Sequence, residues 1–262
     1  MKVLTINNQK GGVGKTMLAV HAAWFFSEIK MQRTLFIDLD PQHNASGVLK
    51  DAAVDQTSFD LLTMAISVPP WPLTLLPAIR HLSQIVAPTE FPGDTVDAQA
   101  LIAQTAANLE TAAESFDIAI IDTSPAWSVK SLVALSVSDY LLSPIDLEDF
   151  SIDGIEELQR SVQMVKMHTN PRLQFLGLVP SRVQTGSQRQ RQALVSIVQS
   201  FGGDLIFAGA AISQRSAFAE AMSERRPVWH DPKTAARTAK NELFQVLEPL
   251  SGRVMAVQPA AA

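Results

Sequence analysis

The sequence predicts an α/β protein in which a doubly wound, mostly parallel sheet is flanked by helices. Short apolar, β-branched runs recur and end in turn residues, as buried parallel strands do. Longer stretches with helical periodicity lie between these runs. The chain has 262 residues and 47% hydrophobic content, enough to bury one large core. We therefore expect residues 1–262 to form a single domain, with a frayed end from about residue 255.

Six apolar runs are expected to form strands. They cover residues 3–7, 34–40, 117–125, 139–146, 173–181 and 204–212. The proline-punctuated segment 67–79 is expected to be irregular with a short edge strand. Helical patterns cover residues 16–29, 97–116 and 151–167, and another begins near 187. Strands that alternate with helices favour right-handed crossovers, and hence a parallel sheet.

The segment between the first predicted strand and the first predicted helix reads NNQKGGVGKTM. Its glycines allow backbone N–H groups to turn toward an anion, and the following helix adds partial positive charge at its N-terminus. Lys15 can reach the β- and γ-phosphates of a nucleotide, and the Thr16 hydroxyl can bind Mg²⁺. The alternative is a structural glycine turn. The predicted nucleotide-binding residues are Lys10, Gly11, Gly12, Val13, Gly14, Lys15, Thr16 and Met17.

A second lysine and three carboxylates accompany this loop. The common pattern G-x-x-x-x-G-K-[ST] places its first glycine at position 9, but the chain has Gln9 there, followed by Lys10. Asp38 and Asp40 end the second predicted strand and Asp122 ends the third, at the sheet edge where open α/β sheets bind ligands. Asp122 fits a carboxylate that holds Mg²⁺ through water. Capping of the next turn is the alternative role for each aspartate.

Together these residues resemble a known family. KGGVGKT at 10–16, DLDPQ at 38–42 and IDTSP at 121–125 are similar to the deviant Walker A ATPases of the ParA/MinD group. The longer string DLDPQHNAS is closest to the switch segment of ParA-type partition proteins. The resemblance covers nearly the whole chain, including residues 212–228. Met17, His43 and Ser124 depart from residues common in the family, and none of these departures removes a phosphate or Mg²⁺ group.

The resemblance implies a fold, a reaction and a switch. The fold is the P-loop NTPase fold in its deviant Walker A form, and the reaction is slow hydrolysis of ATP to ADP and phosphate. Lys10 would reach the nucleotide of the other subunit in an ATP-dependent homodimer, whereas Lys15 would act within its own subunit. Asp40 would orient or activate the attacking water, which makes Lys10, Lys15 and Asp40 the catalytic candidates. The Mg²⁺ ion and its waters would be held by Thr16, Asp38 and Asp122.

The formal net charge of −5 conceals a basic segment. Residues 180–240 contain nine Lys/Arg and four Asp/Glu, whereas residues 1–179 contain 11 and 20. Arginine contacts with phosphate need no base sequence and depend steeply on salt, and the resemblance implies that the ATP dimer binds non-specific DNA through this region. Solvated surface arginines are the alternative, and for Arg182 also stacking near the adenine. The DNA-binding candidates are Arg182, Arg189, Arg191, Arg215, Arg225 and Arg226.

Other functions found on this fold fit less well. A MinD-like, membrane-associated division regulator needs a basic amphipathic C-terminal helix, but Pro249 and Gly252 are expected to interrupt the tail, which after residue 240 has Arg253 as its one base. A carboxylate-activating ligase resembling dethiobiotin synthetase is disfavoured by DLDPQ and Lys10. A non-hydrolysing scaffold would not need these groups. The chain has no cysteine, which excludes disulfides, thiolate zinc sites and cysteine-ligated clusters.

Cargo and location are implied by the resemblance. The cargo is either a plasmid or chromosome complex or a protein assembly such as a carboxysome or chemoreceptor cluster. A ParB-like or other cargo adaptor would stimulate hydrolysis. Because the first predicted strand begins at Val3, we expect no helix-turn-helix domain before the ATPase. No apolar run is long enough to span a bilayer, so a cytoplasmic, nucleoid-associated protein is expected. Trp127 is interpreted as a core residue, with contact to the partner subunit as the alternative.

Overall fold

The computed structural model describes residues 1–78, 82, 97–125, 127–148 and 152–256. Its centre is a six-stranded sheet in the order β3-β2-β4-β1-β5-β6, in which every neighbouring pair is parallel. The predicted doubly wound sheet is confirmed. The strands are β1 (Lys2–Ile6), β2 (Thr34–Asp38), β3 (Leu73–Leu76), β4 (Ile118–Asp122), β5 (Tyr140–Asp146) and β6 (Gln174–Ser181).

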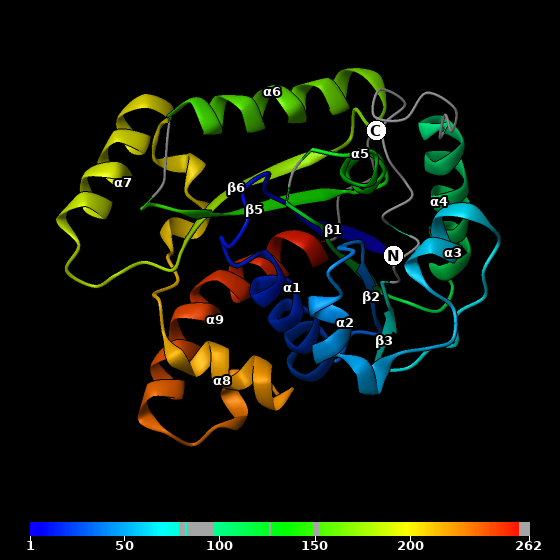
Figure 1. Ribbon diagram of the computed structural model, residues 1–262, viewed down its shortest axis with the longest axis horizontal. Coiled ribbons are helices and arrows are strands. Elements are labelled where there is room, and N and C mark those ends of the chain that lie inside the picture. The colour runs from blue at the N-terminus through cyan, green and yellow to red at the C-terminus, as the bar shows by residue number, and fades with distance from the viewer. Residues whose placement is uncertain (79–81, 83–96, 126, 149–151, 257–262) are drawn as a thin grey trace.

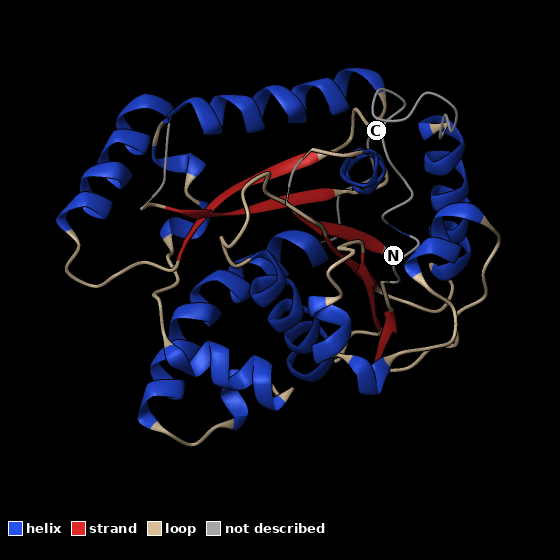
Figure 2. Ribbon diagram, viewed as in Figure 1, coloured by secondary structure: helices blue, strands red, loops and turns tan. Residues whose placement is uncertain are grey.

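Helices cover both faces of the sheet (Figures 1 and 2). One face carries α1 (Lys15–Trp24), α2 (Asn44–Val48), α8 (Ser216–Glu224) and α9 (Thr234–Met255), whose buried side chains share one apolar cluster. The other face carries α3 (Ser58–Thr63), α4 (Ala98–Ala112) and α5 (Val129–Ser136), and beyond them α6 (Ile152–His168) and α7 (Gln188–Phe201) over β5 and β6.

The central strand β4 has a continuous apolar sequence because it is covered on both faces. Ile118 and Ile120 pack into the cluster below α1 and α9, whereas Ala119 and Ile121 pack into the cluster below α4 and α5. Successive side chains of a strand point to opposite faces, and here both faces are covered. All four residues are therefore buried, and no polar residue alternates with them.

One predicted strand is wrong. Residues 204–212 form two short 3₁₀ turns, Gly203–Leu205 and Phe207–Gly209, instead of a seventh strand. Ala208 and Gly209 both have positive φ angles of 55° and 60°, which an extended strand does not allow. Within the described residues, isolated bridges pair Leu178 of β6 with Ile206, and Val183, two residues after β6, with Ser213.

The expected interruption of the C-terminal tail is also wrong. Helix α9 continues past Pro249 and Gly252 to Met255, and both residues lie on its exposed side. The opposite side packs into the core through residues such as Leu243, Leu247 and Leu250, and this burial outweighs the loss of one helical hydrogen bond at proline. The expected frayed residues 257–262 lie outside the described part. Among the described residues, no helix is both long and apolar enough to cross a membrane.

Candidate functional site

A tight loop connects β1 with α1 at the carboxyl edge of the sheet. Gly12 and Gly14 have φ angles of 74° and 88°, in the left-handed region that favours glycine, and Gly14 is the N-cap of α1. A Cβ atom on Gly14 would lie 2.7 Å from the Oγ of Ser181. The loop therefore presses against the end of β6, and its backbone N–H groups and the start of α1 offer an anion site.

The two lysines of this loop have different environments. Lys15 is 5% exposed, and its Nζ donates a hydrogen bond of 2.7 Å to the carbonyl oxygen of Lys10. Burial lowers the pKa of Lys15, and the charges of Asp122 and Asp40 partly oppose this shift. Lys10 is exposed, and its backbone N–H donates to Oδ1 of Asn8 at 2.8 Å. Lys15 thus lies under the loop, whereas Lys10 lies at the surface beside it.

The three predicted carboxylates meet at this sheet edge. Asp38 of β2 is directly paired in register with Asp122 of β4. Asp38 accepts hydrogen bonds at Oδ2 from the N–H and hydroxyl of Ser46, at 2.8 and 2.6 Å, and at Oδ1 from the N–H of Asp40 at 3.0 Å. Burial raises its pKa despite these bonds. Asp40 is 5% exposed, and the N–H of Gln42 donates to its Oδ1 at 3.0 Å.

Asp122 is the buried carboxylate that fits a cation. It has no exposed surface, and neither of its oxygens has a hydrogen-bond partner within the described residues. Burial, followed by the charge of Asp38, raises the pKa of Asp122 well above its usual range. The nearby Thr16 hydroxyl lowers this pKa, although it does not meet the geometry of a hydrogen bond to Asp122. Mg²⁺ takes one or two carboxylates and completes its shell with nucleotide phosphates and water. Thr16, Asp38 and Asp122 fit that use, although the described residues contain no ready-made cage of three or more His, Cys, Asp or Glu.

A hollow of about 480 Å³ opens beside Gly14. Its walls come from the loop, from the end of β6, from the segment before α8 and from α8 itself. Met17, a predicted nucleotide-binding residue, lines it. Gly14, also predicted to bind nucleotide, lines it too, and so does Arg182, for which stacking near the adenine was the alternative to DNA contact. The sequence analysis did not identify Ser181, although it ends a predicted strand at the same edge. Residues from all of these walls line the hollow, among them Gly14, Met17, Ser181, Arg182, Ser213 and Phe218.

Comparison with known proteins identifies the family of this chain. A family model described as an AAA domain matches residues 1–175. Protein IncC of Escherichia coli is 37% identical over 249 residues, which cover 93% of this chain and 67% of IncC. The chromosome partitioning protein ParA of Caulobacter vibrioides is 29% identical over 251 residues, 91% of this chain and 91% of ParA. The chain belongs to the ParA/MinD family of ATPases.

Membership of the ParA/MinD family confirms the resemblance read from the sequence. A solved synthase structure has the same fold as this chain. Cobyrinic acid a,c-diamide synthase from Mycobacterium smegmatis, solved with an ATP analogue and magnesium, matches with a TM-score of 0.73 at 23% identity, over 97% of this chain and 95% of that one. This likeness shows the fold alone. Function within the ParA/MinD family therefore depends on individual side chains and not on the fold.

The arginines predicted to contact DNA do not form one group. Arg182 donates from Nη1 to the carbonyl oxygen of Gly12 at 2.8 Å, so it faces the phosphate loop. Arg189 and Arg191 lie in the first turn of α7, which is the yellow helix at the left of Figure 1. Arg189 is 3.9 Å from Glu148 with 74% of its side chain exposed. Arg191 is exposed, and its guanidinium has no ion pair with another described residue.

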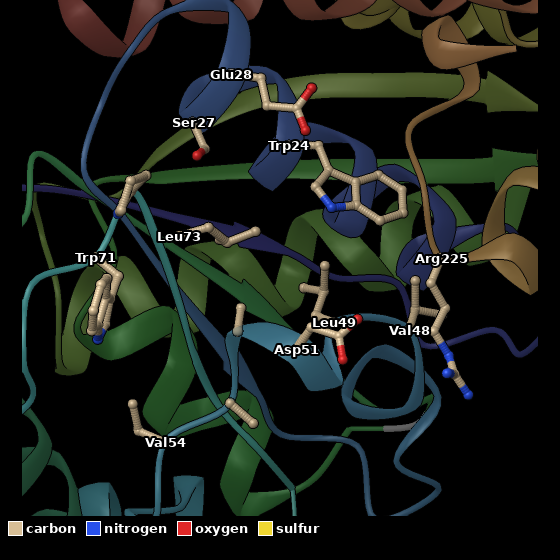
Figure 3. A pocket seen from close by; sticks show the side chains of 13 residues that line it. Trp24, Ser27, Glu28, Val48, Leu49, Asp51, Val54, Trp71, Leu73 and Arg225 are labelled. Atoms are coloured by element: carbon tan, nitrogen blue, oxygen red, sulfur yellow. The ribbon is translucent and has the colours of Figure 1, made fainter.

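The three arginines near α8 have different surroundings: two form ion pairs, and one lines a hollow. Arg215 binds Glu242 of α9 through Nε and Nη2, at 3.1 and 2.6 Å. Arg226 pairs with Glu224 and Asp231. Figure 3 shows Arg225 at one end of a hollow of about 620 Å³ between α1, α2, α8 and the start of β3. Arg225 is exposed, as Arg189 and Arg191 on α7 are, and contact of these arginines with DNA stays a prediction.

Trp127 differs from its expected environment. The sequence interpretation placed it in the core, but 41% of the residue is exposed. Trp127 follows β4 and lies two residues past Pro125, whose Cβ is 3.8 Å from the position that a Cβ atom on Gly11 would occupy. The interpretation as a core residue is wrong, and contact with a partner subunit stays a prediction.

Proposed function

We propose that this chain is an ATP-operated dimer switch that segregates or positions a cargo. The observation that carries the proposal is the meeting of a glycine loop, a buried lysine and an unpartnered buried aspartate at one sheet edge. The loop offers N–H groups to phosphate, Lys15 offers a positive charge, and Asp122 offers a cation ligand. These are the groups that a nucleoside triphosphate with Mg²⁺ requires.

The proposed roles at the nucleotide follow from the contacts of each side chain. Lys15 exchanges the carbonyl of Lys10 for phosphate oxygens, which are stronger acceptors because they are charged. When bound, Mg²⁺ neutralises phosphate charge. Asp40 orients the attacking water, and its hydrogen bond from the Gln42 N–H fixes the carboxylate for that task. The adenosine occupies the hollow beside Gly14, lined by Met17 and Phe218.

Lys10 is proposed to make dimerisation depend on the triphosphate. Its side chain lies at the surface beside the loop, where it can reach the nucleotide of a second subunit and cross the interface only when that nucleotide carries enough negative charge. Trp127, exposed near the same loop, is proposed to pack in this interface. The whole switch is proposed to reside in one domain.

Non-specific DNA binding in the ATP state is proposed to use α7 first. Arg189 and Arg191 are accessible and lie two residues apart on one helix, and two copies in a dimer would bind more tightly than one. DNA binding places the protein on the nucleoid, and a cargo adaptor that stimulates hydrolysis would release it. The buried apolar side of α9 supports a nucleoid location over a membrane one.

The decisive experiment measures mass in solution with ATP, ADP and no nucleotide for the wild type and for Lys10→Ala. We expect an ATP-dependent dimer that Lys10→Ala abolishes, whereas Lys166→Ala, an exposed lysine on α6, behaves like the wild type. Asp40→Ala should bind ATP and dimerise without turnover. An ATP-dependent dimer formed by Lys10→Ala, or normal hydrolysis by Asp40→Ala, contradicts the assigned roles. Nucleotide turnover that requires an added carboxylic acid would indicate a synthase instead.

A further inference from the structure

The side chain of Arg182 connects the end of β6 with the phosphate loop. Its Nη1 donates 2.8 Å to the carbonyl oxygen of Gly12 and lies 3.7 Å from Oδ2 of Asp146, at the end of β5. Asp146 has 13% of its side chain exposed and Arg182 has 47%, and the carboxylate and the loop carbonyl both lie near the same nitrogen, Nη1. The hydrogen bond to the loop joins residues 170 positions apart.

The backbone of Arg182 is also unusual. Its φ angle is 57°, in the left-handed region that costs energy for any residue with a Cβ atom. Its neighbour Ser181 is the residue whose Oγ lies against Gly14. Two consecutive residues at the end of β6 thus face two glycines of the loop, Gly12 and Gly14. A non-glycine residue with a positive φ angle at such a position points to a task for its side chain.

The planarity of the peptide bond shows what that task is. In a trans peptide unit, the C=O of one residue and the N–H of the next point in opposite directions. When Arg182 holds the Gly12 carbonyl toward itself, the N–H of Val13 is turned the other way, away from β6. A phosphate loop binds its anion with backbone N–H groups, and a carbonyl that turned inward would repel the phosphate. The hydrogen bond from Arg182 keeps the Gly12 carbonyl turned toward the guanidinium, which leaves the N–H of Val13 on the opposite side of the peptide unit, available to a phosphate.

We propose that Arg182 is a positioning residue for the phosphate chain of the nucleotide and not a contact to DNA. The proposal rests on the nucleotide binding proposed above, and it identifies which part of the nucleotide depends on this arginine. Asp146 contributes by holding the guanidinium in place. This proposal differs from the sequence prediction, which groups Arg182 with the DNA-binding arginines.

The test compares two probes, ADP with Mg²⁺ and inorganic pyrophosphate with Mg²⁺, by calorimetric titration of the full chain. Arg182→Gly removes the side chain while relieving the positive φ angle, so its thermal stability should equal or exceed that of the wild type. Its affinity for both probes should fall by about tenfold, the value of a hydrogen bond from a charged group. Arg182→Lys should retain most of the affinity, and Arg160→Ala, an exposed arginine on α6, should bind both probes normally.

Each other result has a defined meaning. Loss of ADP binding with unchanged pyrophosphate binding places Arg182 on the base and overturns the proposal, and so does unchanged binding of both probes. A loss that disappears at high salt indicates general attraction between charges instead of loop positioning, and also overturns it, because screening leaves a local hydrogen bond in place. If the wild-type chain binds neither probe, the proposed nucleotide function itself is wrong.

Discussion

The carboxyl edge of the sheet and the basic segment after residue 180 use charge in opposite ways. At the sheet edge, Lys15, Asp38, Asp40 and Asp122 are all buried and close together. In the basic segment, Arg189, Arg191 and Arg225 are exposed, whereas Arg215 pairs with Glu242 and Arg226 with Glu224. Buried charges are costly without a ligand, so the first region indicates its ligand through its geometry. Exposed charges cost little free energy, so the basic segment indicates a partner only through the number and position of its arginines.

The largest expected effect comes from the loop at the sheet edge. Gly14→Ala should abolish nucleotide binding, because its Cβ would lie 2.7 Å from Ser181 Oγ and its φ angle is 88°. Gly47→Ala is the matched control, because a Cβ there meets nothing within 4 Å and alanine favours the helix. Titration with ADP and thermal unfolding of both variants check this. Normal ADP binding by Gly14→Ala would mean that the loop shifts freely.

A buried histidine packs between the helix that follows the phosphate loop and a helix of the basic segment. His21 of α1 lies 5.7 Å from the ring of Phe218 on α8 and 6.0 Å from that of Trp229, and burial lowers its pKa from 6.5 to about 4. The unfolded chain binds the proton more tightly, so the free energy of unfolding should fall by about 3 kcal/mol as the pH decreases from 6.5 to 4. His21→Phe should lose this part of the pH dependence, whereas His168→Asn, at an exposed position, should keep it. Urea titrations across this pH range measure the difference, and parallel curves for His21→Phe and the wild type would contradict it.

A third, smaller effect separates stability from function at the sheet edge. The pKa of Asp122 is raised on folding, so this group stabilises the fold at low pH, and that contribution is lost as the pH rises through its folded value. At neutral pH the empty protein should therefore be more stable as Asp122→Asn, by about 1 to 3 kcal/mol. The same variant should lose Mg²⁺-dependent ATP hydrolysis. Asp51→Asn, an exposed carboxylate, should change neither property. A less stable Asp122→Asn protein would show that its charge is compensated.

The smallest effect concerns single arginines in the basic segment. Arg191→Ala should reduce the slope of log affinity against log salt for random-sequence DNA by about one, without changing stability. Arg215→Ala should leave that slope unchanged and lower the free energy of unfolding by about 1 to 2 kcal/mol, because its guanidinium binds Glu242. Filter binding over a salt series and thermal unfolding distinguish the two. Exchanged outcomes would mean that Arg215 leaves Glu242 to contact DNA.

Much of the fold and of the nucleotide site could be predicted from the sequence, for local reasons. A buried parallel strand must be apolar throughout, and a phosphate loop must have glycines at positive φ angles, so both are recognisable from a few adjacent residues. The failures have tertiary causes. Ala208 turns the chain with a φ angle that an apolar pattern does not reveal, and α9 passes Pro249 because its other side is buried. The pairing of Arg215 with Glu242 joins residues 27 positions apart, beyond the range of any local pattern.

The crowding of Asp38 and Asp122 at the sheet edge has a consequence for the lifetime of the protein in a cell. Two facing carboxylates in register oppose folding when no cation or nucleotide is present, and any ligand that binds only the folded chain adds stability in proportion to the logarithm of its concentration. Unfolded molecules are the ones that proteases remove. The nucleotide-free form should therefore be degraded before the nucleotide-bound form, and loss of the nucleotide should shorten the lifetime of this protein.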